Sequence, residues 1–502
     1  MRWALNVSSS YLKFILSMVI VFFMTPYIVS ELGLERFGLW SLLFAVIGVF
    51  GLLDLGFATA GVKYVAEAFG AQDDERRNVV LSTLFFMYAG LGVLCVGVVS
   101  VGTQSAGSWF DLSATHQEDF RIAMWILGGC LAASLPLSVF RSAMTGIGQV
   151  TVVNVCAIAA AVLQAVLTVV LLKQGYGLRG LAIAAGANML AQSVLLIPLC
   201  YRLLPGFSIT VAKFSASQVR ELGAFSIYAF IANVAVLIIL RIDPVVIKMY
   251  LPLSAIAVYA IAIRIAEYAL LLNKQFSNAL MPLVSQSHGS GDVDTVRRVL
   301  IDGTRLLLGI ALPFLGLLWF YAPELIELWM GPQFEAAAPL LRILLLAAAF
   351  SVLQLNAANV LGMTGAHRFV AFAMLGSAGL NLVLSILLVQ YFELTGVASA
   401  TLVAAFCIEM GLIVPHACRQ RGTTYWQFLH EAVWPALPPL VPMFAAAWWM
   451  SLMMPVYGFV ALLCGGVVSA LVYFAAFWIV GVQRDEKEWV AQNVRALRPA
   501  NL

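Results

Sequence analysis

The chain has 502 residues, of which 62% are hydrophobic and 11% are charged, and its mean hydropathy is +0.96. A soluble protein needs far more charged side chains to cover its surface, so this composition indicates a polytopic membrane protein. The formal net charge is only +3, and no long run of Lys and Arg occurs. The composition therefore gives no basis for a nucleic-acid partner.

The amino-terminal apolar run is longer than the core of a signal peptide and has no A-x-A-like end, which predicts a retained first span. Windows of about twenty apolar residues then predict fourteen transmembrane helices with short connections and no strands. The predicted fold class is an all-α polytopic membrane protein. The predicted spans are 10–31, 37–61, 79–102, 120–141, 150–172, 178–201, 223–250, 251–282, 303–321, 337–361, 368–391, 394–416, 433–453 and 456–481.

Basic residues near the ends of these spans orient the chain, because loops rich in Lys and Arg stay in the cytoplasm. Twenty basic residues lie on the side of the amino terminus, including Arg484, Lys487, Arg495 and Arg498 in the tail. The other side holds six, which are Arg36, Arg121, Lys173, Arg179, Lys248 and Arg342. This asymmetry predicts that both termini are cytoplasmic.

Weak self-similarity at a nearly constant offset predicts an internal repeat. Leu32–Trp40 lies over Leu251–Tyr259, Gly146–Asn154 over Met363–Ala371, and Leu178–Ala182 over Leu394–Ala398. The repeat predicts two parallel lobes of six helices, 1–205 and 206–420, followed by a helical hairpin and cytoplasmic tail over 421–502. Parallel repeats are typical of secondary transporters, in which the substrate site lies between the lobes near the midplane.

The stretch IILRIDPVVIKMYL, Ile238–Leu251, interrupts an apolar run with an arginine and an aspartate. The repeat places Arg241 over Phe22 and Asp243 over Met24, inside an unambiguous span. Both charges are therefore predicted to lie at membrane depth, where a charge is costly and suggests function.

The span 251–282 adds Arg264 and Glu267, which share one helical face because they are three residues apart. A buried guanidinium cannot lose its charge and needs an anion. If Arg241 and Arg264 face one cavity, they suit phosphate oxygens, which accept bidentate hydrogen bonds. The alternative is structural: Arg264 pairs with Glu267, and Arg241 and Asp243 extend to the interface.

Other polar residues inside predicted spans are candidates for lining the cavity or for binding a coupling proton or sodium ion. These are Asp54, Asp243, Glu267, Asn273 and Glu409. Asn273 matches Asp54 in the repeat. Asp54 is a candidate gate or proton site and Glu409 a candidate proton carrier, while a purely structural role is the alternative for each acidic residue.

Motifs of catalysis and of metal or cofactor binding are absent from the sequence. The seven cysteines form no CxxC pair, and there is neither a G-x-x-x-x-G-K-[ST] nor an H-E-x-x-H motif. The five histidines are scattered over different loops. The sequence therefore predicts a transporter without cofactor or metal, and not an enzyme.

Two segments resemble a known family. The run from Arg241 to Glu267, RIDPVVIKMYLPLSAIAVYAIAIRIAE, is similar to the seventh and eighth helices of Wzx-like polysaccharide flippases, PST-type members of the MATE-like MOP superfamily. Phe37–Phe57 resembles the second helix of that family and ends in its Asp-x-Gly element. The resemblance extends over the whole chain, including the count of fourteen helices.

The resemblance implies that the chain translocates an undecaprenyl-pyrophosphate-linked oligosaccharide across the bacterial inner membrane for synthesis of surface polysaccharide, exopolysaccharide or O-antigen. It implies alternating access, a cationic cavity for the pyrophosphate, contact with membrane lipids and a polysaccharide polymerase as partner. Arg241 and Arg264 match as anion-binding candidates, and Asp54 matches the acidic position of the family. The chain departs from some lipid-flipping relatives in its first span, which has only Lys13 near the cytoplasmic end.

Two alternatives remain from the sequence. A MATE-like drug or metabolite antiporter shares the architecture, although such proteins usually have twelve helices. A membrane-embedded polysaccharide polymerase or ligase is the other, although such enzymes usually have a sizeable outer loop with Arg or His, and the outer loops here are short and acidic.

Overall fold

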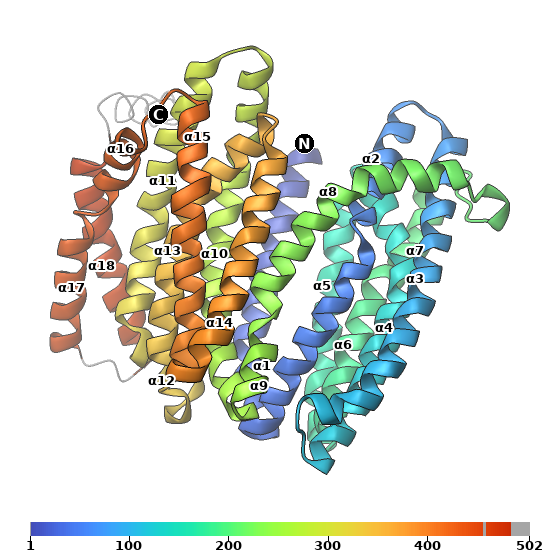
Figure 1. The fold of residues 1–502 in the computed structure, drawn as a ribbon, viewed down its shortest axis with the longest axis horizontal. Helices are drawn as coiled ribbons and strands as arrows, with labels where there is room; N and C mark the ends of the chain where they lie inside the picture. The colour runs from blue at the N-terminus through green and yellow to red at the C-terminus, as the bar shows by residue number, and fades with distance from the viewer. Residues whose placement is uncertain (1, 455–457, 483–502) are drawn as a thin grey trace, which may run out of the picture. The chain divides into compact units, whose positions relative to one another are not determined.

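The computed structural model describes residues 2–454 and 458–482, which are helical throughout apart from short connections and contain no strand (Figure 1). In this part of the chain, eleven helical runs are long and apolar enough to cross a membrane. Two runs each join two helices, where the backbone turns to positive φ at Gly33 (75°) and at Glu393 (50°). With the segment 216–250, the fourteen predicted spans are accounted for, and the predicted all-α fold class is confirmed.

The chain divides into two compact units, residues 1–260 and 261–502. The repeat predicts lobes that end at residues 205 and 420. These lobes are defined by sequence similarity and not by compactness, so their boundaries stay a prediction. The basic tail residues Arg484, Lys487, Arg495 and Arg498, and the start of the last predicted span at 456, lie outside the described residues.

The N-terminal unit contains α1 (Arg2–Phe50), α2 (Phe57–Gly70), α3 (Asp74–Trp109), α4 (Ala114–Gly146), α5 (Val150–Lys173), α6 (Gly177–Val194), α7 (Leu196–Leu203), α8 (Ala216–Arg241), α9 (Asp243–Tyr250) and the start of α10 (Leu253–Gly289).

In the N-terminal unit, hydrogen bonds between polar side chains join α1 and α5. Asn6 Oδ1 accepts from the Thr151 hydroxyl at 2.8 Å, and Asn154 Nδ2 donates to Ser9 Oγ and Ser10 Oγ, each at 3.0 Å. The residue numbers of the two partners differ by 144 or 145 in each of these bonds. The first half of α1 therefore runs parallel to α5. Such bonds hold helices together in a bilayer, where apolar side chains gain nothing by leaving lipid for protein.

Helices α8 and α9 pack against α1 in the N-terminal unit, and α8 also packs against α2 and α3. The start of α10 lies close to the backbone of α1. A Cβ atom at Gly38 of α1 would overlap the carbonyl oxygen of Leu253. Only glycine is compatible with this distance between the two backbones.

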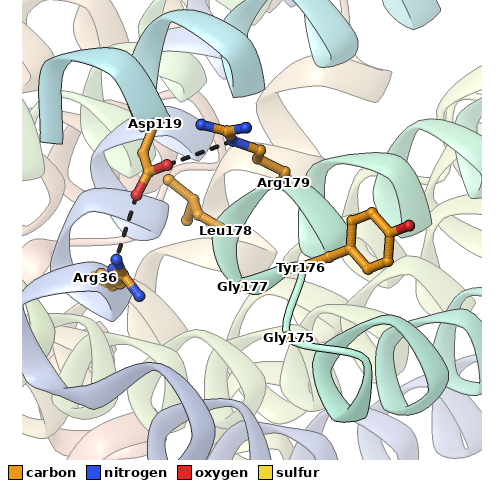
Figure 2. A pocket seen from close by; sticks show the side chains of 7 residues that line it. All are labelled: Arg36, Asp119, Gly175, Tyr176, Gly177, Leu178 and Arg179. Carbon is orange, nitrogen blue, oxygen red and sulfur yellow. Dashed lines mark ion pairs between the residues drawn. The ribbon is translucent and has the colours of Figure 1, made fainter. Parts of the chain in front are cut away.

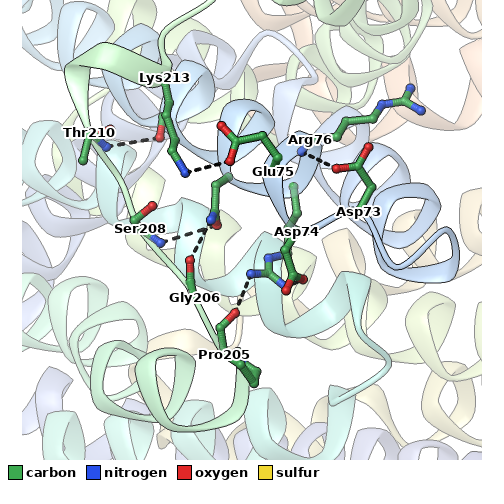
Figure 3. Close-up of polar contacts among 12 residues, drawn as sticks. Asp73, Asp74, Glu75, Arg76, Pro205, Gly206, Ser208, Thr210 and Lys213 are labelled. Carbon is green, nitrogen blue, oxygen red and sulfur yellow. Dashed lines mark hydrogen bonds and ion pairs between the residues drawn. The ribbon is translucent and has the colours of Figure 1, made fainter.

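The segment 204–215, which joins α7 to α8, is attached to the amino-terminal end of α3 (Figure 3). Arg77 donates to the Pro205 carbonyl oxygen at 2.9 Å and pairs with Asp74. Asn78 donates to the Gly206 carbonyl oxygen at 2.7 Å and accepts from the Ser208 N–H at 3.4 Å. The Arg77 side chain is only 2% exposed, so its charge depends on these partners.

The C-terminal unit contains the rest of α10 and the helices that follow it. These are α11 (Val293–Phe320), α12 (Ala322–Met330), α13 (Ala337–Met363), α14 (His367–Ala404), the π-helical η4 (Ala405–Ile413), α15 (Val414–Gln420), α16 (Tyr425–Phe428), the π-helical η5 (Leu429–Val433), α17 (Leu440–Met453) and α18 (Phe459–Val480).

The last helices are attached to the C-terminal unit through buried hydrogen bonds. Arg305 of α11 pairs with Asp302 at 3.0 Å and donates to the Glu431 carbonyl oxygen at 3.3 Å. The Tyr321 hydroxyl donates to the Ala447 carbonyl oxygen of α17 at 3.1 Å. The hairpin of α17 and α18 is therefore docked on α11 and its carboxyl end.

The attachment of segment 204–215 gives a first prediction. Arg77→Ala removes a charge-assisted hydrogen bond, worth about 1.5–3 kcal/mol, and leaves the Pro205 carbonyl oxygen without this donor. We expect the segment to open more often, so that trypsin cleaves after Lys213 at least about tenfold faster in detergent, as quantified by mass spectrometry of the fragments.

Arg76→Ala is the matched control. It removes the same charge from the next residue, where both ion pairs are exposed and measure 3.9 Å, and such pairs contribute little. Equal cleavage rates in the two variants would contradict the anchoring role of Arg77.

Candidate functional site

Arg241 and Asp243 lie at the junction of two helices. Arg241 ends α8 and Asp243 begins α9, with Ile242 between them in helical backbone geometry. Pro244 follows at the start of α9, where its missing N–H interrupts the hydrogen-bond ladder. The predicted single helix over 223–250 is therefore two helices, and the break falls between the two charges.

Arg241 is half-buried and packs against Gly48 of α1. A Cβ atom at Gly48 would lie 3.1 Å from Arg241 Cγ and 3.3 Å from Cδ, so the absence of a side chain makes room for the arginine stem. Within the described residues of the N-terminal unit, the guanidinium forms no hydrogen bond or ion pair. A cation at membrane depth without a carboxylate partner can bind an anion from outside the protein.

Asp243 has protein partners instead. Its side chain is only 3% exposed, and Oδ2 accepts from the Tyr259 hydroxyl at 2.6 Å. The carboxylate also lies in the first turn of α9, where the helix dipole stabilises negative charge. These contacts support a structural role, the alternative that the sequence left open.

Asp54 lies where the predicted span 37–61 breaks, so the prediction of one helix there is wrong. Helix α1 ends at Phe50, a 3-10 turn covers Gly51–Asp54, and Leu55 and Gly56 take positive φ before α2 begins. The Asp54 carboxylate accepts from the Ala58 N–H at 3.3 Å and from the Tyr88 hydroxyl of α3. Tyr88 also contacts the Ser138 hydroxyl of α4, so Asp54 links the break to two neighbouring helices.

In the C-terminal unit, α10 carries the other predicted residues of this region. Arg264 is half-buried and hydrogen-bonds Tyr268, one turn further along the same helix. Glu267 is half-buried beside them. Asn273 is buried, and its Nδ2 donates to the Ala269 carbonyl oxygen at 2.8 Å, so its amide is partly used in the helix itself.

Glu409 lies apart from these residues, in the π-helical segment η4 of the C-terminal unit. Its neighbour is Ser351 of α13, whose hydroxyl hydrogen-bonds the carboxyl group. The predicted residues are thus divided between the two units. Asp54, Arg241 and Asp243 belong to the N-terminal unit, and Arg264, Glu267, Asn273 and Glu409 belong to the C-terminal unit.

A pair of cations in the N-terminal unit was missed from the sequence. Asn6 Nδ2 donates to the Gly148 carbonyl oxygen at 3.0 Å, which sets the level of α1 against the end of α4. Lys13 follows Asn6 by seven residues and Arg141 precedes Gly148 by seven, so both lie about 10 Å further into the unit. Their positive charges repel each other.

Neither cation has a carboxylate partner among the described residues of its unit. Arg141 donates to Gln192 Oε1 of α6 at 2.6 Å, and Gln192 donates in turn to Asn188. The group Lys13, Arg141, Gln192 and Asn188 is therefore called the N-terminal cationic cluster. The sequence prediction treated Arg141 as the last residue of the span 120–141, whereas α4 continues to Gly146.

A pocket of about 260 Å³ lies elsewhere in the N-terminal unit (Figure 2). Asp119 bridges two arginines there, 3.7 Å from Arg36 Nε and 3.6 Å from Arg179 Nε. Because both arginines are paired with carboxylates, Arg179 also with Glu118 at 3.3 Å, and no predicted site residue lines the pocket, we assign it to the packing of α1, α4 and α6. Among the described residues, no three His, Cys, Asp or Glu side chains gather as metal ligands.

The arrangement of helices matches that of solved transporters. An inward-facing multidrug resistance MATE family transporter of the MOP superfamily aligns with a TM-score of 0.69 at 17% identity, over 82% of this chain and 98% of that one. The lipid II flippase MurJ in an inward closed conformation aligns with a TM-score of 0.71 at 14% identity, over 95% and 99%. The chain has the fold of MOP-superfamily transporters, as its resemblance predicted.

Sequence comparison places the chain more narrowly. Residues 3–288, more than half of the chain, match the model of a family described as polysaccharide biosynthesis protein, and the chain belongs to this family. Residues 229–387 also match the MatE family model.

Three curated relatives are similar in sequence, two of them over most of their length. The uncharacterized membrane protein EpsK of Bacillus subtilis is 24% identical over 68% of each chain. The probable flippase AglR of Haloferax volcanii is 18% identical over 76% of each chain. The probable low-salt glycan biosynthesis flippase Agl15 of the same organism is 26% identical over 40% of this chain.

The contact between Asp54 and Tyr88 gives a second prediction. Tyr88→Phe removes one donor to a carboxylate at the helix break, and Asp54→Ala removes the acceptor. Because the two residues contact each other, we expect their effects on the free energy of unfolding to be non-additive by about 1–3 kcal/mol, measured by a double-mutant cycle in detergent.

Phe57→Leu serves as the reference for lost packing, because the Phe57 ring contacts Tyr88 but makes no hydrogen bond to Asp54. Additive effects of the Asp54 and Tyr88 variants, within about 0.5 kcal/mol, would show that the hydrogen bond does not hold the break together.

Proposed function

We propose that the chain is a flippase that moves undecaprenyl-pyrophosphate-linked oligosaccharide units from the cytoplasmic to the outer leaflet of the bacterial inner membrane. It does so by alternating access, in the synthesis of a surface polysaccharide or exopolysaccharide. Membership of the polysaccharide biosynthesis family and the MOP-type fold support this class. The relatives Agl15 and AglR, both named as probable flippases, and the structural neighbour MurJ, a lipid II flippase, support the lipid-linked substrate.

The observation that carries the proposal is the guanidinium of Arg241 beside Gly48, which has no hydrogen bond or ion pair among the described residues of the N-terminal unit. A diphosphate offers several oxygens to a planar guanidinium, which binds such groups through two parallel hydrogen bonds. The glycine at position 48 keeps the arginine stem against α1 without a competing side chain. Arg241 is therefore proposed as a diphosphate-binding residue of the N-terminal unit.

Arg264 is proposed as the diphosphate-binding residue of the C-terminal unit. Its contact with Tyr268 is a neutral hydrogen bond, which uses one of the guanidinium N–H donors without neutralising the charge. An incoming anion can share the guanidinium with the tyrosine, because arginine has five N–H donors. The tyrosine then orients the guanidinium along α10.

The N-terminal cationic cluster is proposed as a loading site near the cytoplasmic ends of α1 and α4. Two uncompensated cations at one depth attract a dianionic headgroup, while the Gln192 and Asn188 amides offer neutral hydrogen bonds of the kind that suits sugar hydroxyls. In this proposal each compact unit carries cations that bind an anion.

The orientation follows from the distribution of basic residues, with both termini in the cytoplasm. A coupling proton or sodium ion and a polysaccharide polymerase complete the proposed set of partners. The polymerase would consume the translocated units on the outer side.

A second candidate function is a MATE-like drug antiporter, which the MatE match over residues 229–387 favours. The two functions differ in substrate charge, because drugs of this class are commonly cationic, whereas the unpaired groups Arg241, Lys13 and Arg141 attract anions. Efflux of ethidium that is unaffected by Arg241→Ala would support the antiporter.

The role of Arg241 gives a third prediction. In proteoliposomes that hold a fluorescent undecaprenyl-diphosphate-linked disaccharide, we expect Arg241→Ala to slow appearance of the lipid in the opposite leaflet by about 10- to 100-fold. This corresponds to the loss of a charge-assisted hydrogen bond of about 1.5–3 kcal/mol. Arg241→Lys is expected to recover only part of the rate, because an ammonium cannot bind bidentately.

Lys248→Ala is the matched control, because it removes one positive charge from α9 without touching Gly48. Its rate is expected to stay within about twofold of wild type, since a long side chain near a helix end reaches the interface. A similar loss of rate in both variants would show that only the net charge matters, and would contradict a specific role for Arg241.

The N-terminal cationic cluster gives a fourth prediction. We expect the double variant Lys13→Gln, Arg141→Gln to bind undecaprenyl diphosphate at least about tenfold more weakly, as measured by fluorescence titration of the purified protein. Gln192→Ala, which removes only the neutral partner of Arg141, is expected to bind within about twofold of wild type. Unchanged affinity in the double variant would exclude the loading site.

A further inference from the structure

Glu409 lies in a π-helical segment close to the middle of a membrane span. Segment η4 covers Ala405–Ile413, and π-helical turns of this kind are rare and often occur at functional sites. Glu409 precedes the end of the span at Gln420 by eleven residues, which is about 16 Å of helix. Its side chain is 9% exposed. A carboxylate at this depth is costly without a partner.

On η4 and the helix packed against it, α13, two buried acceptor oxygens lack a donor among the described residues. Ser351 of α13 hydrogen-bonds the carboxyl group, but the second carboxyl oxygen, Oε2, has no partner in the described part of the chain. Gln354 lies three residues after Ser351 on the same face of α13 and is 5% exposed. Its Oε1 likewise has no donor within the described residues.

No cation in the described part of the C-terminal unit pairs with Glu409. The titratable and charged side chains on the elements packed against η4 are Arg342 on α13, His367, Arg368, Tyr391 and Glu393 on α14, and His416, Cys418 and Arg419 on α15, with Cys407 on η4 itself. Tyr391 is 81% exposed. Arg342 donates to the Trp319 carbonyl oxygen, and His416 stacks on Phe369. His367, Arg368, Glu393, Cys407 and Arg419 are exposed.

Each buried acceptor oxygen that lacks a donor destabilises the folded protein by about 1–3 kcal/mol. A proton on Glu409 removes the negative charge and gives the carboxyl group an O–H donor of its own. The carboxylate has only the Ser351 hydroxyl as a donor among the described residues. A sodium ion is less suited, because it needs several oxygen ligands, and among the described side chains only the Ser351 hydroxyl is hydrogen-bonded to the Glu409 carboxyl group. The observations therefore favour a proton over a metal cation.

We propose that Glu409, Ser351 and Gln354 form a proton-binding site that couples transport to the proton gradient, which rests on the proposed function of the chain as a flippase. One proton adds to the carboxylate to give a carboxylic acid, and no other bond forms or breaks. Loading changes the hydrogen bonding of a π-helical turn, which can shift to α-helical register by one residue and turn neighbouring side chains by about 100°. This links proton binding to the shape of the span.

Proton binding can be tested without any substrate. In infrared difference spectra of the full-length protein between acid and alkaline buffer, we expect a carbonyl band of a buried carboxylic acid that is lost in Glu409→Gln. The matched control is Glu393→Gln, which removes an exposed carboxyl group of the same helical run and should keep the band. A band that persists in Glu409→Gln would overturn the proton site whether or not the chain is a flippase.

Coupling is tested by transport. If one proton moves per cycle, a gradient of one pH unit shifts the distribution of an undecaprenyl-diphosphate-linked disaccharide between the leaflets of proteoliposomes by about tenfold. In Glu409→Gln we expect no shift, and in Glu409→Asp, which keeps the carboxyl group, a partial one. A shift that follows a sodium gradient, or that survives in Glu409→Gln, would overturn the coupling.

Absence of transport in wild type together with the expected infrared band would refute the flippase proposal and with it the coupling, while the proton site itself would stand. The two failures are thus distinguishable.

Discussion

Every polar group inside the bilayer must find a partner in the protein, because lipid offers none. This constraint explains most of the polar side chains described here. Asn6, Ser9, Ser10, Thr151 and Asn154 satisfy one another between α1 and α5, and Asp243 is satisfied by Tyr259. The residues that depart from it are therefore the informative ones, since an uncompensated charge persists only where something else binds it.

The residues that depart from this constraint include both positive and negative side chains. Arg241, Lys13 and Arg141 are positive groups without a carboxylate partner among the described residues of the N-terminal unit, and Glu409 is a negative group without a cation in the C-terminal unit. The first three suit an anionic headgroup, and the last suits a proton. A transporter that moves an anionic lipid at the expense of a proton gradient needs both kinds of site, which is why one proposal joins them.

Hydropathy predicted the fold because it follows directly from the cost of burying charge. The predicted spans 150–172 and 337–361 end within two residues of α5 and α13, where Lys173 and Thr364 follow the apolar runs. The break at Leu55 and Gly56 was not predictable from hydropathy, since a change in backbone φ leaves the apolar pattern intact. The Asp-Leu-Gly sequence there was the available signal.

The site was predictable in part. The repeat placed Arg241 at membrane depth, but its contact with Gly48 depends on packing between segments far apart in sequence. Arg141 was missed because it was taken only as a basic residue at the end of the span 120–141, whereas α4 continues for another turn to Gly146. Its proximity to Lys13 depends on the hydrogen bond between Asn6 and Gly148, which no pattern within either helix contains.

The central claim is that the chain recognises the anionic headgroup of a polyprenyl lipid through Arg241. Native mass spectrometry of the purified full-length protein with equal amounts of undecaprenyl diphosphate and undecaprenol measures this preference directly. The account predicts that wild type binds the diphosphate at least about tenfold more tightly than the alcohol, and that Arg241→Ala loses most of this preference while Lys248→Ala keeps it. Equal binding of the two lipids by wild type would contradict the account.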